Sequence, residues 1–181
     1  MKGKEFDTKT APLSFIDLEM TGLEAAKHEI LEIGLLKVSQ PDLEIIESWE
    51  VKVRPENLAS ADEEALKVNG FSEEKWKDAI SLKEAMEVLA PKASGTILAG
   101  WNIATDYAFL DAAVTKTGVK LDFHKHVFDA HSYAAAKLGL EWGSSGLSTT
   151  TKNLGIEILG HHSALPDAIA CFEVYKKVKG S

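Results

Sequence analysis

The chain has 181 residues, of which 45% are hydrophobic and 27% are charged. These proportions are typical of a soluble globular protein and exclude a disordered or fibrous chain, and no apolar run approaches the roughly 18–20 residues that a membrane helix needs. The formal net charge of −8, taken alone, argues against nucleic-acid binding, because contact with phosphates usually requires a basic surface.

The length suits a single domain. Residues 1–12 are polar and contain lysines but no apolar core, so we expect a short flexible leader before one domain at 13–181, and no secretory signal. The single cysteine, Cys171, cannot form an internal disulfide, which fits a reducing, cytoplasmic location. Its apolar neighbours in a helical pattern predict a buried thiol and not a nucleophile.

Hydrophobic patterning predicts strands and helices in chain order. Apolar or alternating runs predict strands at 13–17, 30–38, 45–53, 96–99 and 127–128, with a hairpin turn at Pro41 and Asp42. Helical spacing is present at 62–68, 82–90, 107–117, 130–138, 147–154 and 166–178, and we expect every proline at an element edge. Early antiparallel hairpins followed by strand–helix alternation predict an α/β fold with a mixed five-stranded sheet flanked by helices.

Two carboxylates lie at the end of the first predicted strand. Asp17 and Glu19 are two residues apart, so both side chains point to the same face of the strand. Like charges placed together raise each other's pKa unless a cation lies between them, and hard divalent cations prefer oxygen ligands. The pair therefore indicates a metal site. Considered alone, it fits two solvated acids at a strand end better, because exposed acids are common.

Two further groups of polar residues follow later strands. Asp106 comes after the fourth strand and opens a helix, which it would cap in the alternative interpretation; Asp111 is a weaker rival for the same role. His162 and Asp167 are five positions apart across a helix start that Ser163 would cap. Such a pair is able to face one cavity, but by itself it fits a polar loop entering a helix.

The combination of the three groups resembles the DEDDh exonucleases, a family that includes polymerase proofreading subunits, ribonuclease T and oligoribonuclease. The first motif, Ile16-Asp17-Leu18-Glu19-Met20-Thr21-Gly22-Leu23, is similar to oligoribonuclease. Three further segments resemble the proofreading type: Glu29-Ile30-Leu31-Glu32-Ile33-Gly34, Val68-Asn69-Gly70-Phe71-Ser72 and Leu154-Gly155-Ile156. The resemblance extends from about residue 13 to 178 and implies a ribonuclease H-like fold.

The resemblance implies a 3′-5′ exonuclease that hydrolyses phosphodiester bonds at the 3′ end of DNA or RNA and releases nucleoside monophosphates. It makes His162 the general base, and His161 is a rival that lacks the five-residue spacing to Asp167. It also implies two divalent ions, Mg²⁺ or Mn²⁺, with four catalytic carboxylates as their ligands: Asp17, Glu19, Asp106 and Asp167.

For the substrate, the resemblance implies that Asn102 supports the second motif and that the pocket for the terminal nucleotide is lined by Leu18, Met20, Thr21 and Leu23. Trp101 and Thr105 stand where many members have His and Phe, which bears on substrate preference more than on activity. Base stacking on Trp101 or Tyr107 is an interpretation that core packing explains equally well.

The expected partner is the 3′ end of single-stranded DNA or RNA, and no membrane. Bound divalent ions would bring positive charge to the cleft. This partly reconciles nucleic-acid binding with the negative net charge of the chain. A basic stretch able to contact phosphates, or simply solvated, comprises Lys116, Lys120, His124, Lys125 and His126. Ribonuclease T and oligoribonuclease work as dimers, so the resemblance allows a homodimer. It also allows a polymerase partner.

Two other functions compete with the exonuclease. One is a non-catalytic nucleic-acid-binding or scaffold domain on the same fold, which the presence of all five expected site residues disfavours. The other is a zinc hydrolase that would use some of His124, His126, His131, His161 and His162. Zinc sites favour tight His or Cys spacing, and the pair at 124 and 126 has it, but no third ligand follows in a recognisable pattern.

Overall fold

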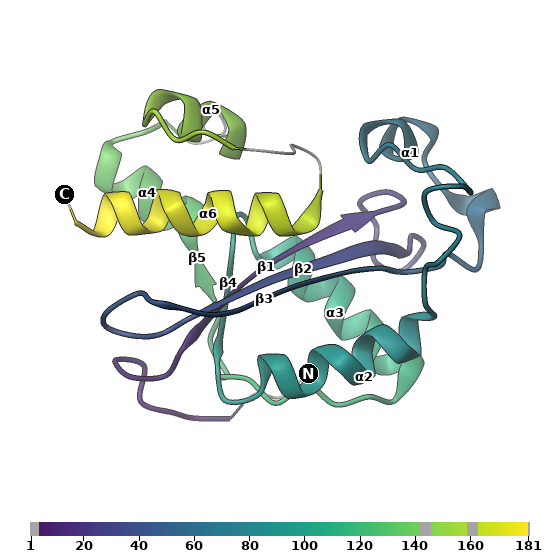
Figure 1. Cartoon of the computed structure of the whole chain (residues 1–181), viewed down its shortest axis with the longest axis horizontal. Helices are drawn as coiled ribbons and strands as arrows, with labels where there is room; N and C mark the ends of the chain where they lie inside the picture. Colours follow the sequence, from purple (N-terminus) through teal and green to yellow (C-terminus); the bar gives the residue numbers. More distant parts are fainter. Residues whose placement is uncertain (1–3, 142–145, 159–162, 181) are drawn as a thin grey trace.

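The computed structural model describes residues 4–141, 146–158 and 163–180 (Figure 1). The strands in this part of the chain are β1 (Leu13–Met20), β2 (Ile30–Val38), β3 (Ile45–Lys52), β4 (Ile97–Gly100) and β5 (Phe128–Asp129). The helices are the 3₁₀ turn η1 (Leu58–Ser60), α1 (Glu63–Val68), α2 (Leu82–Ala93), α3 (Ala104–Thr117), α4 (Ala130–Leu138), α5 (Leu147–Asn153) and α6 (Ala164–Lys179).

The strands form one mixed sheet in the order β3-β2-β1-β4-β5, so the predicted five-stranded α/β fold is confirmed. The three N-terminal strands pair antiparallel through two hairpins. On the other side of β1, the strands β4 and β5 are added in parallel, after helical crossovers. This topology places β1 at the centre of the sheet, with its carboxyl end in the middle of one edge.

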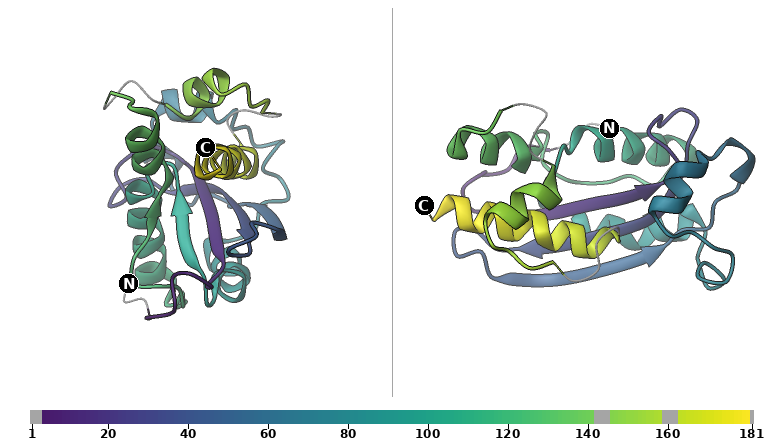
Figure 2. Two further views of the ribbon diagram at one scale, coloured as in Figure 1. Left: turned by 90° about the vertical axis from the view of Figure 1, so that its left-hand side faces the viewer. Right: turned by 90° about the horizontal axis from the view of Figure 1, so that it is seen from above.

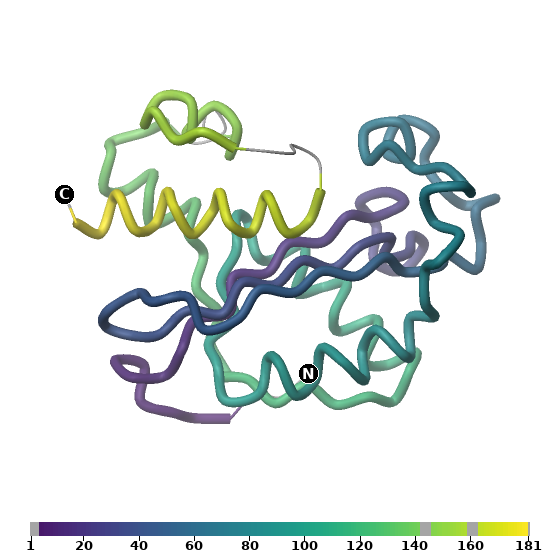
Figure 3. Tube along the Cα trace, viewed as in Figure 1, coloured from purple at the N-terminus to yellow at the C-terminus, as the bar shows by residue number. Residues whose placement is uncertain are grey.

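Helices cover both faces of the sheet. Figures 1 and 2 show α6 with α4 and α5 on one face and α2 with α3 on the other, and the tube in Figure 3 follows the same layers. Alternation along β1 distributes its side chains between two cores: Phe15 packs with Phe172 of α6, whereas Ile16 and Leu18 pack in the cluster that contains Leu110 of α3. Residues 17 and 19 continue the Phe15 side, toward α6.

Several boundaries differ from the prediction. β1 continues beyond Asp17 to Met20, because residues up to Met20 still pair with β2. α3 begins at Ala104, before the predicted start. The prediction that every proline lies at an element edge is wrong for Pro91, which lies inside α2, in its last turn, where the helix extends to Ala93. An exposed site near the end of a helix tolerates proline better than a buried helix centre.

The stretch before β1 contacts the domain. The Lys4 N–H donates to the Phe123 carbonyl at 2.8 Å, Lys4 forms an isolated parallel bridge with His124, and Ala11 is buried. Cys171, a residue of α6, is buried in the core, as predicted. No helix in the described part of the chain has both the length and the apolarity needed to cross a membrane.

Candidate metal centre

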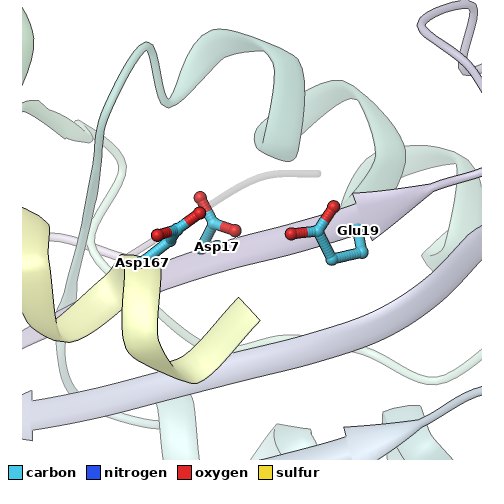
Figure 4. Close-up of side chains that lie close together, drawn as sticks. All are labelled: Asp17, Glu19 and Asp167. Carbon is cyan, nitrogen blue, oxygen red and sulfur yellow. The ribbon is translucent and has the colours of Figure 1, made fainter. Parts of the chain in front are cut away.

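Three predicted acids converge above the carboxyl end of β1. One carboxylate oxygen from each of Asp17, Glu19 and Asp167 lies within 4.8 Å of the others. Figure 4 shows Asp17 and Glu19 on β1 and Asp167 approaching from the first turns of α6. All three side chains are only partly buried, so the cluster is open to solvent. The strand-end pair and the late helix acid, 148 positions beyond Glu19 in the numbering, therefore form one site.

The close approach of α6 to β2 brings Asp167 into this cluster. Gly34 of β2 lies directly under the helix start, where an added Cβ would overlap the backbone of Ala164 and Leu165. Ser163 occupies the N-cap position as predicted, but its hydroxyl does not accept a hydrogen bond from its own helix. The hydroxyl instead donates to carboxylates of the neighbouring strands, at 2.7 Å to Glu32 and 3.1 Å to Glu50.

The fourth predicted acid, Asp106, lies beside the cluster but in a different setting. It is in the first turn of α3 and is 5% exposed. Its Oδ1 accepts the backbone N–H of Leu18 at 3.0 Å, so it contacts the centre of β1 between the two strand acids. The alternative role as a helix cap does not occur, because Ile103 is the N-cap residue. Among the described residues, the group with mutual metal-binding distances does not include Asp106.

The electrostatics of the acids favour a bound cation. Burial raises the pKa of Asp17 well above its usual value, and the charges of Asp106 and Glu19 raise it further. Burial, followed by the charge of Asp167, raises the pKa of Glu19 to about 7. Burial also raises the pKa of Asp106 to about 7, although hydrogen bonds from its own backbone N–H and from that of Leu18 oppose the shift. A divalent ion would lower these pKa values, because it converts mutual repulsion into attraction.

A pocket adjoins Glu19 at the end of β1. It has a volume of about 340 Å³, and its apolar walls come from Met20, Leu23, Ala65 and Val68, between the β1 end and α1. Leu23 is 80% exposed and Val68 49% exposed, so two apolar side chains face solvent at this pocket. Two predicted substrate contacts, Met20 and Leu23, therefore line one cavity next to the acids.

The other predicted substrate residues lie elsewhere. Leu18 is buried in the core on the α3 side, and Thr21 is fully buried, where its hydroxyl accepts the N–H of Glu29 at 2.9 Å. Neither side chain lines the pocket, so any part they play is through supporting the end of β1. Asn102 is exposed, between β4 and α3, and has a φ of 58°, a left-handed conformation that asparagine tolerates.

His161 and His162 lie outside the described residues. Of the zinc alternative's other histidines, His124 is 2% exposed and its Nδ1 accepts the N–H of His126 at 3.1 Å. Within the described ranges, the only group of metal-binding side chains at mutual ligand distance is the acidic one. A zinc site built on the pair at 124 and 126 therefore has no support from the geometry of these ranges.

Two lysines of the basic stretch, which begins in the last turn of α3, form ion pairs with acids. Lys116 pairs with Glu29 at 3.2 Å and with Glu56 at 2.8 Å, and Lys125 pairs with Glu5 at 3.2 Å. These ion pairs favour the interpretation as a solvated, neutralised surface over one that contacts phosphates.

The two proposed stacking rings also pack internally. Trp101 lies against His131, with ring centroids 5.1 Å apart, and Tyr107 lies edge-on against Phe123. Core packing therefore explains both positions.

Sequence reasoning did not single out Asp129 at the end of β5. Its two oxygens accept the N–H of Ile103 at 3.0 Å and the N–H of Ser132 at 2.7 Å, so it connects the starts of α3 and α4. Its place just before a helical pattern was a signal for a cap. The contact with Ile103, across 26 positions, had no such signal.

Sequence reasoning also gave no separate role to Glu32. This acid stands inside the apolar run of β2 and is 3% exposed. Burial, followed by a hydrogen bond with Glu50, raises the pKa of Glu32 to about 7. Its position was a usable signal, since a charged residue within a buried strand requires a partner.

Solved exonuclease structures share the fold. The nuclease domain of 3′hExo, a DEDDh family member bound to rAMP, aligns with a TM-score of 0.76 at 19% identity, covering 97% of this chain and 96% of that domain. E. coli Exonuclease I in complex with a dA16 oligonucleotide aligns with a TM-score of 0.77 at 17% identity, covering 94% of this chain and 41% of that one. The expected ribonuclease H-like fold is confirmed.

Related sequences occur within much longer polymerases. The PolC-type DNA polymerase III of Thermotoga petrophila is 27% identical over 167 residues, and that of Staphylococcus saprophyticus is 27% identical over 177 residues. The alignments cover 92% and 98% of this chain but only 12% of each polymerase. The exonuclease family model of the RNase_T type matches residues 14–175, nearly the whole chain, and the chain therefore belongs to this exonuclease family.

Proposed function

We propose that this chain is a divalent-metal-dependent 3′-5′ exonuclease that releases nucleoside monophosphates from single-stranded DNA or RNA. The observation that carries the proposal is the convergence of Asp17, Glu19 and Asp167 within 4.8 Å, on an open face of a family exonuclease fold. Three carboxylates at this spacing are a donor set suited to hard cations, and burial with mutual repulsion raises the pKa of two of them, Asp17 and Glu19.

The residues that would hold the ions are Asp17, Glu19 and Asp167, with Asp106 as the fourth acid. When bound at these residues, two Mg²⁺ or Mn²⁺ ions would supply activation of the attacking water and stabilisation of the departing 3′ oxygen. The protein supplies position: β1 fixes two acids, and α6 fixes the third. The Leu18 N–H holds Oδ1 of Asp106 against the strand, which keeps this fourth acid beside the cluster.

His162 would act as general base and take the proton of the attacking water. An imidazole with an unperturbed pKa of about 6.5 accepts a proton near neutral pH. Activity is therefore expected to fall as the pH drops below about 6.5, where free imidazole is protonated. The pH profile of kcat for the wild type and for His162→Ala checks this role, and full activity of the variant would contradict it.

The pocket beside Glu19 would receive the terminal nucleotide. Its exposed Leu23 and Val68 present apolar surface on which the flat face of a base is able to pack. The pocket adjoins the acidic cluster through Glu19, so a terminal nucleotide held there would place the phosphodiester on its 5′ side toward the cluster. This arrangement requires no broad basic face, which is consistent with the net charge of −8.

The biological setting is inferred from the relatives. The PolC polymerases contain the related segment within a longer chain, and this supports a proofreading-like role with a polymerase partner, in a cytoplasmic location. The 3′hExo structure with rAMP and the Exonuclease I structure with dA16 support single-stranded RNA or DNA as substrate. A homodimer stays a prediction.

Digestion of 5′-labelled single-stranded DNA and RNA oligonucleotides with Mn²⁺ tests the proposal, with Asp17→Ala as the control. A ladder that shortens from the 3′ end, and is absent with the control, is the expected result. No cleavage of either strand by the wild type would favour the non-catalytic scaffold. Activity restored to chelated protein by Zn²⁺, and not by Mg²⁺ or Mn²⁺, would favour the zinc hydrolase.

A further inference from the structure

The first turn of α6 satisfies its backbone donors in an unusual way. The initial N–H groups of a helix have no partner within the helix, and a side chain at the N-cap commonly accepts from one of them. Ser163, at the N-cap, makes no such bond. The Ala164 N–H instead donates to Glu32 at 3.2 Å, and the Leu165 N–H donates to Glu50 at 3.2 Å.

We call Glu32 and Glu50 the carboxylate clamp. They come from adjacent strands, β2 and β3, and both also accept from the Ser163 hydroxyl. A hydroxyl has one proton to donate, so two ionised carboxylates would compete for it. The two carboxyl groups also hydrogen-bond to each other, so one proton lies between them and the Ser163 proton is not contested by two full charges. The clamp thus connects three donors of the helix start to the sheet.

The clamp is close to the metal centre but separate from it. Glu32 is the strand partner of Glu19, on the face of the sheet that α6 covers. Among the described residues, the group at metal-binding distance contains Asp17, Glu19 and Asp167 and leaves Glu32 out. The clamp also occupies the positive end of the α6 dipole, so those N–H groups are engaged and not available to a phosphate.

We propose that the carboxylate clamp positions Asp167 for metal binding, and so controls the metal affinity and turnover of the centre without contacting substrate. Asp167 is one turn beyond the clamped residues, and its N–H donates to the Ser163 carbonyl at 3.2 Å. Loss of the clamp would release the helix start and move one of three clustered ligands. The effect on turnover rests on the proposed exonuclease function; the effect on metal affinity does not.

The test is a set of substitutions at Glu32. Glu32→Leu keeps the volume but removes the acceptor, whereas Glu32→Gln keeps an oxygen for Ser163 and Ala164 and an N–H for Glu50. Substitutions behind metal ligands typically cost about 10–100-fold in affinity or activity. We expect Glu32→Leu to raise the Mn²⁺ concentration for half-maximal activity and to lower kcat by at least about tenfold, with KM for a short oligonucleotide unchanged. Glu32→Gln should behave like the wild type.

Three results would overturn the proposal. The first is a folded Glu32→Leu variant with unchanged Mn²⁺ dependence and kcat. The second is an equal loss of Mn²⁺ affinity and kcat in Glu32→Leu and Glu32→Gln. That result would mean that the charge of Glu32, and not its hydrogen bonds, is required. The third is a rise in KM alone. Circular dichroism and thermal melting establish that each variant is folded.

Glu50→Ala serves as the second variant if Glu32→Leu does not fold, because Glu50 is at the exposed edge of the sheet. Its matched control is Glu47→Ala, an acid of the same strand that pairs with Lys92. Glu50→Ala should raise the Mn²⁺ concentration that gives half-maximal activity, and Glu47→Ala should not. Equal behaviour of the two variants would contradict the clamp.

Two measurements separate the clamp from the proposed activity. Calorimetric titration with Mn²⁺ reports metal affinity, and hydrogen exchange reports protection of the Ala164 and Leu165 amides. If the wild type binds Mn²⁺ but cleaves no oligonucleotide, the proposed function fails. The clamp is then supported by weaker Mn²⁺ binding and faster exchange in Glu50→Ala, and refuted if both are unchanged.

Discussion

The starts of α3 and α6 each bring an acid to the same end of β1, but they do so differently. At α3, Asp106 is almost fully buried and already accepts a backbone N–H from β1. At α6, Asp167 is partly exposed and lies at ligand distance from two other acids. One acid is therefore fixed as part of the fold, and the other is held where a cation would bind. We expect removal of the two acids to have different consequences.

The largest expected effect is on activity in Asp167→Asn. Loss of a ligand at an open metal site removes several kcal/mol of charge stabilisation, which corresponds to a fall of roughly three orders of magnitude in kcat. Mn²⁺ binding should weaken in parallel, measured by calorimetry. Metal affinity that equals that of the wild type would show that Asp167 is not a ligand.

The second effect is on stability, in Asp106→Asn measured without metal. The pKa of Asp106 is about 7 in the folded chain against an ordinary 3.8, so between these values the folded state binds more protons than the unfolded state. Its contribution to stability is complete below about pH 4 and is lost as the pH rises through about 7. At pH 8 the variant should therefore be more stable than the wild type, by about 1–3 kcal/mol.

Urea unfolding at pH 5 and pH 8 in the presence of a chelator measures this difference, which should shrink at the lower pH. Asn keeps an oxygen for the Leu18 N–H. Asp106→Ala does not, and the unpaired buried N–H should cost about 1–3 kcal/mol relative to Asn. A variant ranking with Ala above Asn would contradict the role of that hydrogen bond.

The smallest expected effect is a loss of stability in Asp129→Ala. This variant tests whether a supporting acid at the start of α3 affects metal binding. Asp129 connects Ile103 and Ser132 but lies outside the acidic cluster. Loss of a helix-capping acid typically costs about 0.5–2 kcal/mol of stability. Thermal melting should show this loss, with Mn²⁺ affinity changed less than by any change at Asp167. If Asp129→Ala weakened Mn²⁺ binding more than Asp167→Asn, Asp129 would contribute directly to the metal site, contrary to the observed geometry.

Local signals were sufficient for most of the fold. The apolar run at 30–38 gave β2 with its observed bounds, and the 130–138 pattern gave α4. The centre of the site was also predictable, since Asp17 and Glu19 share a face by strand periodicity alone. Asp167 needed the resemblance, because no local pattern states where a distant helix packs.

The supporting contacts were beyond sequence reasoning. Ser163 and Glu32 are 131 positions apart, and nothing near either residue encodes their hydrogen bond. The orientation of Asp106 toward Leu18, across 88 positions, has the same character. Such contacts depend on the exact position and orientation of each helix on the sheet. Hydrophobic periodicity predicts only which face of a helix packs against the sheet.

Gly34 sets how near α6 comes to β2. Since the helix start rests on a bare backbone, with no room for even a methyl group, no side-chain rotamer enters the separation between the sheet and the helix at this point. The backbone at Gly34 therefore limits how closely α6 approaches β2, and the carboxylate clamp acts on a helix start that already lies at this separation. Changes in the core residues further along α6 should leave this separation unaltered, so the approach of the helix to the sheet tolerates much of the sequence variation that the fold accepts.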